Sequence, residues 1–145
     1  MNVKLGCVML TVLLGAGGAA TDAKKDTAKF QGTWTVDTLT YDGKEHKLKF
    51  NIVFKGNDGT VKNNEKVQNE YAKIKFMLDP SSKPRSMDIT ITDGSQTDST
   101  MKGIYEWKDD ELRICAKVFG TERPKEFDAP EGSSTVLLVL KRVSK

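Results

Sequence analysis

Hydrophobic and polar residues alternate along most of the chain after residue 30, and this alternation predicts β-strands. The clearest case is His46–Lys55, in which Leu48, Phe50, Ile52 and Phe54 face one way and mostly lysine and asparagine face the other. Threonine, valine and aromatic residues, which favour strands, dominate Thr33–Tyr41. The remaining predicted strands are Thr60–Asn63, Val67–Leu78, Arg85–Thr92, Thr100–Trp107, Glu111–Val118 and Ser134–Arg142.

Short turn sequences separate most of these eight predicted strands. Asp42-Gly43 and Asp93-Gly94 are typical hairpin signals. The one long irregular connection is 119–133, which we expect Phe119 and Phe127 to pin to the domain. Consecutive strands with short connections pair antiparallel. The sequence therefore predicts an all-β fold, an eight-stranded antiparallel up-and-down barrel, with an open two-sheet sandwich as the alternative.

The first 20 residues follow the order of a secretory signal peptide. Lys4 precedes the apolar run Leu5–Leu14, and the small residues Gly15–Ala20 come after it. This order predicts cleavage after Ala20 and a secreted or periplasmic mature protein. The apolar stretch is short for a bilayer span, so we expect no membrane span after cleavage.

The mature chain has the length of one domain, because the whole sequence counts only 145 residues. Residues 21–31 are predicted as a short N-terminal segment with one short helix against the barrel end, and residues 32–145 as the barrel. The 23 basic and 20 acidic residues nearly balance, so the charge carries no signature of nucleic-acid binding. The lysines at 47, 49, 55, 73 and 75 are predicted to form a solvated outer face.

Few residues of the sequence are candidates for catalysis or metal binding. The single histidine, His46, excludes a multi-histidine metal site and is predicted to be a solvated turn residue. Cys115 is the only cysteine after cleavage. Arg113 and Lys117 share its face and would favour the thiolate, but we expect a small, half-buried strand residue instead. Asp109, Asp110 and Glu111 are predicted to form a hairpin turn. We expect no metal, no cofactor and no enzymatic activity.

The function depends on how the apolar faces of the strands pack, because an eight-stranded barrel is just wide enough to be either hollow or filled. A hollow barrel would bind a small apolar ligand, whereas a filled one would be a structural or protein-interaction module whose partner is another protein. The candidate lining residues are Trp34, Phe50, Ile52, Phe54, Ile74, Phe76, Leu112 and Ile114, with Leu48 and Leu138 as further members.

Two short features resemble the lipocalins. Gly32-Thr33-Trp34 at the start of the first predicted strand resembles the lipocalin Gly-x-Trp signature, and Arg142 resembles the arginine that lies across that tryptophan. A planar guanidinium stacks well on an indole ring. The resemblance implies that Trp34 and Arg142 meet where the barrel closes and have a structural role.

Most of the mature chain also resembles a family of small secreted domains, found in planctomycete-type bacteria, that has no assigned activity. This resemblance implies a bacterial, exported, lipocalin-like barrel and no particular reaction. The matching pieces are Phe30–Trp34, Val53–Gly56, Asp79-Pro80 with Lys83-Pro84, Ile89–Gly94, Gly103–Glu106, Leu112–Cys115, Arg123-Pro124 with Phe127, and Val136–Arg142.

Overall fold

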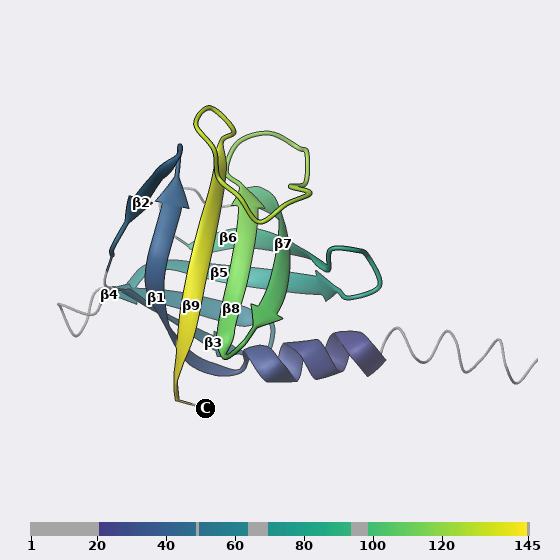
Figure 1. Ribbon diagram of the computed structural model, residues 1–145. Helices are drawn as coiled ribbons and strands as arrows, with labels where there is room; N and C mark the ends of the chain where they lie inside the picture. Colours follow the sequence, from purple (N-terminus) through teal and green to yellow (C-terminus); the bar gives the residue numbers. More distant parts are fainter. Residues whose placement is uncertain (1–20, 49, 64–69, 94–98, 145) are drawn as a thin grey trace, which may run out of the picture.

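The computed structural model describes residues 21–48, 50–63, 70–93 and 99–144 of the chain. Within these residues, one helix precedes a single antiparallel sheet (Figure 1). The predicted signal peptide lies outside the described residues. The strands are β1 (Gly32–Tyr41), β2 (Lys44–His46), β3 (Phe50–Lys55), β4 (Asp58–Asn63), β5 (Glu70–Asp79), β6 (Ser86–Asp93), β7 (Thr100–Lys108), β8 (Glu111–Lys117) and β9 (Thr135–Ser144).

The sheet closes into a barrel because β1 pairs with both β3 and β9. From β3 to β9 each strand pairs antiparallel with the next, so the order is an up-and-down meander. β1 and β3–β9 make the closed eight-stranded barrel, which confirms the predicted all-β fold and excludes the open sandwich.

The predicted strand His46–Lys55 is wrong in one respect, because the structure divides it. β1 pairs with β3 only as far as Val36 and then, from Leu39 onward, with the short β2. A register shift between Val36 and Thr38 in the β1–β9 ladder, of the kind that a β-bulge produces, marks the same place. Leu48 lies between the two strands and is 45% exposed, so it does not point into the barrel as its period predicts.

The N-terminal helix, residues 21–30, covers one end of the barrel, which we call the helix end (Figure 1). The Gln31 side chain holds the β3–β4 turn there, accepting a hydrogen bond from the Gly56 amide and donating one to its carbonyl. Arg85, before β6, lies 3.6 Å from the Asp26 carboxylate on the helix. Among the described residues, no helix is long and apolar enough to cross a membrane.

The long connection between β8 and β9, residues 118–134, covers part of the outer surface of the barrel. The prediction for Phe119 is wrong, because its side chain is 64% exposed. Ala129 is buried instead, and its carbonyl accepts a hydrogen bond from the Gly43 amide in the β1–β2 turn. Below this connection, Ile104 and Cys115 are buried although they point away from the barrel interior.

Candidate functional site

The helix end of the barrel is filled by aromatic side chains. Phe30, the last residue of the helix, is fully buried, and its ring lies between 5.3 and 5.4 Å from four other aromatic rings. Most of these pairs meet edge to face, which is a favourable geometry for aromatic rings. The four rings around Phe30, which together with it we call the aromatic plug, belong to Phe54, Phe76, Tyr105 and Trp107.

Polar atoms in this filled half are paired. The Tyr105 hydroxyl donates a 2.7 Å hydrogen bond to the Asp26 carboxylate, and the Trp34 indole N–H donates one of 2.7 Å to the Phe30 carbonyl. Burial, followed by the hydrogen bond to Asp26, raises the pKa of Tyr105 far above its usual value. The hydroxyl therefore stays protonated and ties the helix to the barrel.

The opposite end, which we call the far end, has inward-facing apolar side chains that are only partly buried. Along β3, Phe54 and Ile52 are buried, while Phe50 is partly exposed; along β9, Leu140 is buried and Leu138 is not. On β1, β5 and β7, Val36, Phe76 and Tyr105 are likewise buried, while Leu39, Ile74 and Met101 are only partly buried. On β8, by contrast, the inward side chains stay buried as far as Ala116. The partly buried residues toward this end, which we call the far-end residues, are Leu39, Phe50, Val61, Ile74, Met101, Val136 and Leu138. Two further partly buried apolar residues, Leu78 and Trp107, lie beside the helix.

All eight residues that the sequence offers as barrel lining belong to one apolar cluster. Trp34, Ile52, Phe54, Phe76, Leu112 and Ile114 are buried in it, whereas Phe50 and Ile74 are packed against it among the far-end residues. The sequence reasoning missed Phe30 and Tyr105, and it missed Leu39, Met101 and Val136 at the far end. The one available signal was the period of two, which continues through Tyr105 and Met101 on β7.

Trp34 and Arg142 make the contact expected from the resemblance to lipocalins. They are opposite each other in the β1–β9 ladder, and the guanidinium carbon lies 4.3 Å from the indole centroid. Trp34 is 2% exposed. The Arg142 guanidinium also donates to the carbonyls of Gln31 and Lys29, so it fastens the end of the helix to the closing strands.

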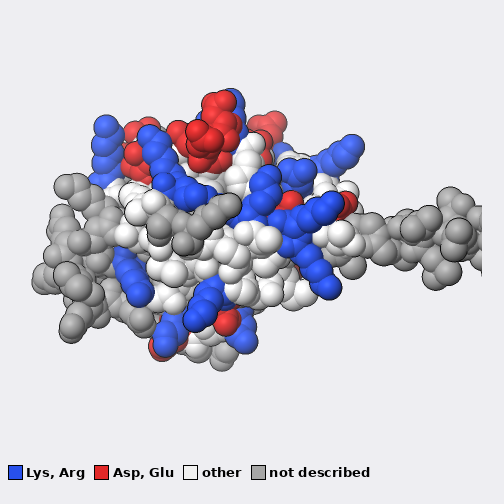
Figure 2. All heavy atoms as spheres, turned by 90° about the horizontal axis from the view of Figure 1, so that it is seen from below, with Lys and Arg blue, Asp and Glu red and all other residues white. Residues whose placement is uncertain are grey.

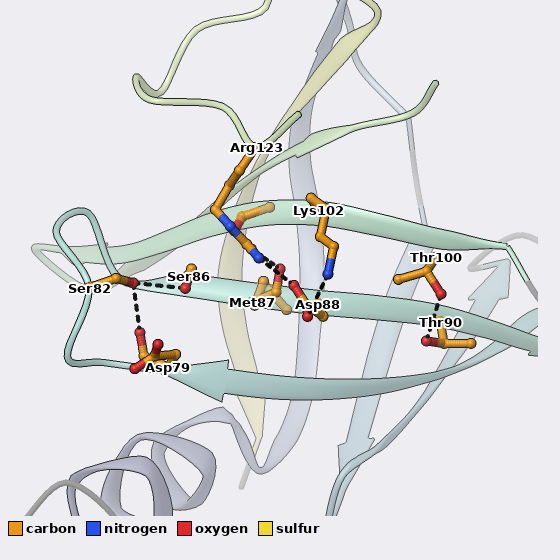
Figure 3. Close-up of polar contacts among 10 residues, drawn as sticks. Asp79, Ser82, Ser86, Met87, Asp88, Thr90, Thr100, Lys102 and Arg123 are labelled. Atoms are coloured by element: carbon orange, nitrogen blue, oxygen red, sulfur yellow. Dashed lines mark hydrogen bonds and ion pairs between the residues drawn. The ribbon is translucent and has the colours of Figure 1, made fainter. Parts of the chain in front are cut away.

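Arg123 fastens the long connection to the outside of the barrel (Figure 3). One of its terminal nitrogens donates to the carbonyls of Met87 and Gly103, and the other lies 2.7 Å from the Asp88 carboxylate. Lys102 donates to the same carboxylate at 2.9 Å. Partial burial works against ionisation of Asp88, but these two cations outweigh it and hold its pKa below the usual value.

The other candidate residues have structural positions. Cys115 is fully buried rather than half-buried, and burial raises the pKa of its thiol, so the flanking Arg113 and Lys117 do not produce a thiolate. Its Sγ donates to the Asp128 carbonyl of the long connection. His46 is exposed on β2. Within the described ranges, no group of three or more metal-ligating side chains is present.

No family model, no curated protein and no solved structure matches the chain.

Proposed function

We propose that this protein is an exported, non-enzymatic binding domain that takes a small apolar ligand into the far end of its barrel. One observation carries the proposal, namely the change from buried to partly exposed apolar side chains along the inner wall. An inner wall that stays accessible and apolar is the usual character of a small-molecule site in a barrel mouth. The signal-peptide pattern of residues 1–20 supports the export.

The chemistry of the wall favours a ligand without a polar group at its inner end. The Tyr105 hydroxyl and the Trp34 indole N–H already have partners. Of the described residues, only Arg113 has a buried side-chain polar atom without a hydrogen bond, and Arg113 alternates with the inward-facing Leu112 and Ile114. Binding energy therefore comes from apolar surface, at about 25 cal/mol per Å² before the costs of association.

The aromatic plug limits how deeply a ligand reaches. Phe30 and its neighbouring rings occupy the helix end, so a ligand stops above Phe54 and Phe76. The ligand is accordingly small, and we expect a dissociation constant on the order of 10 μM.

Titration with an uncharged apolar dye, N-phenyl-1-naphthylamine, tests the proposal. We expect dye fluorescence to rise on binding to the wild-type protein. Val136→Phe adds a ring among the far-end residues and should weaken dye binding by about tenfold or more. Val53 lies on the outward face of β3, so Val53→Phe is the matched control and should leave dye binding unchanged. Thermal melts establish that both variants fold.

The second candidate function is a filled barrel that serves as a structural or protein-interaction module. The observation in its favour is that large side chains occupy both ends, with the aromatic plug at one and Phe50 and Met101 at the other. A folded wild-type protein that binds no dye, or a Val53→Phe variant that loses as much binding as Val136→Phe, would favour this second function.

A further inference from the structure

A pocket with charges of both signs lies at the helix end, beside the aromatic plug. It has a volume of about 590 Å³ and is lined by the end of the helix, the β7–β8 turn and Arg142 of β9. In Figure 2, which looks at the molecule from below, acidic side chains gather at the top with basic side chains on either side. The residues that line this pocket, which we call the helix-end pocket, are Ala28, Lys29, Trp34, Trp107, Asp109, Asp110 and Arg142.

Two cations are held against the aromatic walls of the pocket. The Lys29 ammonium lies 4.1 Å from the centroid of the Trp107 ring, and the Arg142 guanidinium lies 4.3 Å from that of Trp34. Such contacts are favourable because the face of an indole ring is electron-rich. Arg142 is fixed further by its hydrogen bonds to the Gln31 and Lys29 carbonyls. Positive charge therefore has a defined place on one side of the pocket.

Two carboxylates belong to the other side. Asp109 and Asp110 form the two-residue turn between β7 and β8, whose last paired residues are Lys108 and Glu111. The backbone of Asp109 is left-handed, with a φ of 56°, a conformation that aspartate tolerates better than most residues. In the part of the chain that the structure describes, neither carboxylate comes within 4.0 Å of the Lys29 or Arg142 nitrogens.

We infer that the helix-end pocket binds a small zwitterion of the amino-acid type that carries an apolar side chain. Its carboxylate lies toward Lys29 and Arg142, its ammonium lies toward Asp109 and Asp110, and its apolar group lies against the edge of Trp107. A zwitterion satisfies both sets of charges at once, whereas an ion of one sign meets repulsion from the other set. The inference is independent of the far end of the barrel and does not rest on the ligand proposed there.

The two tryptophans give a direct readout, because the chain contains two and both line this pocket. The probe is L-phenylalanine, titrated while tryptophan fluorescence is excited selectively. We expect a saturable change with a dissociation constant on the order of 1 mM. N-acetyl-L-phenylalanine lacks the ammonium and L-phenylalanine amide lacks the carboxylate, so each should bind about fivefold more weakly.

Charge-removing variants identify which group meets which side. Lys29→Gln should weaken binding of L-phenylalanine and of its N-acetyl derivative by about fivefold, and it should not weaken binding of the amide, which Lys29 repels. The double variant Asp109→Asn with Asp110→Asn should weaken binding of L-phenylalanine and of the amide, and it should not weaken binding of the N-acetyl derivative, which the two carboxylates repel. Lys108→Gln and Glu111→Gln remove charges from the same hairpin outside the pocket lining and serve as matched controls.

The inference fails if L-phenylalanine causes no saturable change, or if all three compounds bind equally well. It also fails if the controls weaken binding as much as the pocket variants do, because general surface charge would then explain the effect. Circular dichroism of each variant establishes that the fold is retained. Dye binding at the far end should be the same in all of these variants, so the two sites are tested separately.

Discussion

Tyr105 ties the N-terminal helix to the barrel, and Tyr105→Phe measures what this tie contributes. The side chain is fully buried, and its hydroxyl donates a 2.7 Å hydrogen bond to Asp26 of the helix. Its ring lies 5.4 Å from Phe30 and 5.5 Å from Trp107. Phenylalanine keeps these ring contacts and removes only the hydroxyl, so the substitution isolates the hydrogen bond.

The expected loss at neutral pH follows from the partners. A hydrogen bond to a charged group contributes about 1.5–3 kcal/mol to the free energy of unfolding. Asp26 is only 8% exposed, but the Arg85 guanidinium remains 3.6 Å from its carboxylate and partly compensates for the lost donor. We therefore expect Tyr105→Phe to lower the free energy of unfolding by about 2 kcal/mol.

The same residue predicts how stability depends on pH. The folded protein raises the pKa of Tyr105, whereas tyrosine in an unfolded chain ionises near pH 10. Above that pH the unfolded state binds fewer protons than the folded state. The contribution of Tyr105 is therefore complete below about pH 10 and falls by up to about 1.4 kcal/mol per pH unit above it. In Tyr105→Phe, the free energy of unfolding should therefore fall less steeply with pH above about pH 10 than in the wild-type protein.

Urea unfolding followed by circular dichroism, at neutral pH and at several pH values above 9, measures both effects. Tyr41 on β1 is only half-buried, so Tyr41→Phe is the control and should change the free energy of unfolding by less than about 0.5 kcal/mol. Tyr105 does not make this contribution if Tyr105→Phe costs no more than the control, or if the wild-type protein and Tyr105→Phe lose stability equally at alkaline pH.

Four further predictions concern other parts of the chain. Trp34→Ala should cost about 3–5 kcal/mol of unfolding free energy, and a double-mutant cycle with Arg142→Lys should give a coupling of at least about 0.5 kcal/mol; additive effects would contradict the contact. The buried Cys115 thiol should react with a thiol reagent only after denaturation, and rapid labelling of the native protein would contradict its burial. Arg123→Gln should make residues 118–134 more sensitive to trypsin without unfolding the barrel, because three of its hydrogen bonds are lost. Mass spectrometry of the exported protein should place its first residue near Thr21, and a full-length chain in the membrane fraction would contradict the signal peptide.

The closed barrel could be predicted because short stretches of the sequence indicate both its strands and its turns. Alternation of apolar and polar residues marks each strand, and short turns restrict which strands become neighbours. The break between β2 and β3 could not be predicted, since the alternation continues through Leu48 without interruption. The break arises because β1 pairs with β3 as far as Val36 and with β2 from Leu39 onward. The alternation of apolar and polar residues within a strand does not indicate which other strand it pairs with.

The long connection shows the same limit for packing. Phe119 and Phe127 are its large apolar residues, and hydrophobicity alone favours them as anchors. Phe119 is exposed and Phe127 is partly buried, while the Arg123 guanidinium and the buried Ala129 also fasten the segment. Arg123 finds two carbonyls and a carboxylate at one place on β6 and β7, an arrangement that exists only after the sheet has formed.

The candidate site depends on a contact that the sequence does not reveal. Phe50 and Phe54 lie at equivalent positions in the alternation of β3, yet only Phe54 is fully buried. The difference arises because Phe30 enters the barrel from the helix and packs against Phe54, 5.3 Å away between ring centroids, while Phe50 lies further from the helix end. Phe30 is the one large apolar residue in the polar segment 21–31, and the sequence of this segment is typical of an exposed helix. If this one side chain divides the barrel into a filled and an accessible half, then the space open to the proposed ligand is set as much by the N-terminal helix as by the strands.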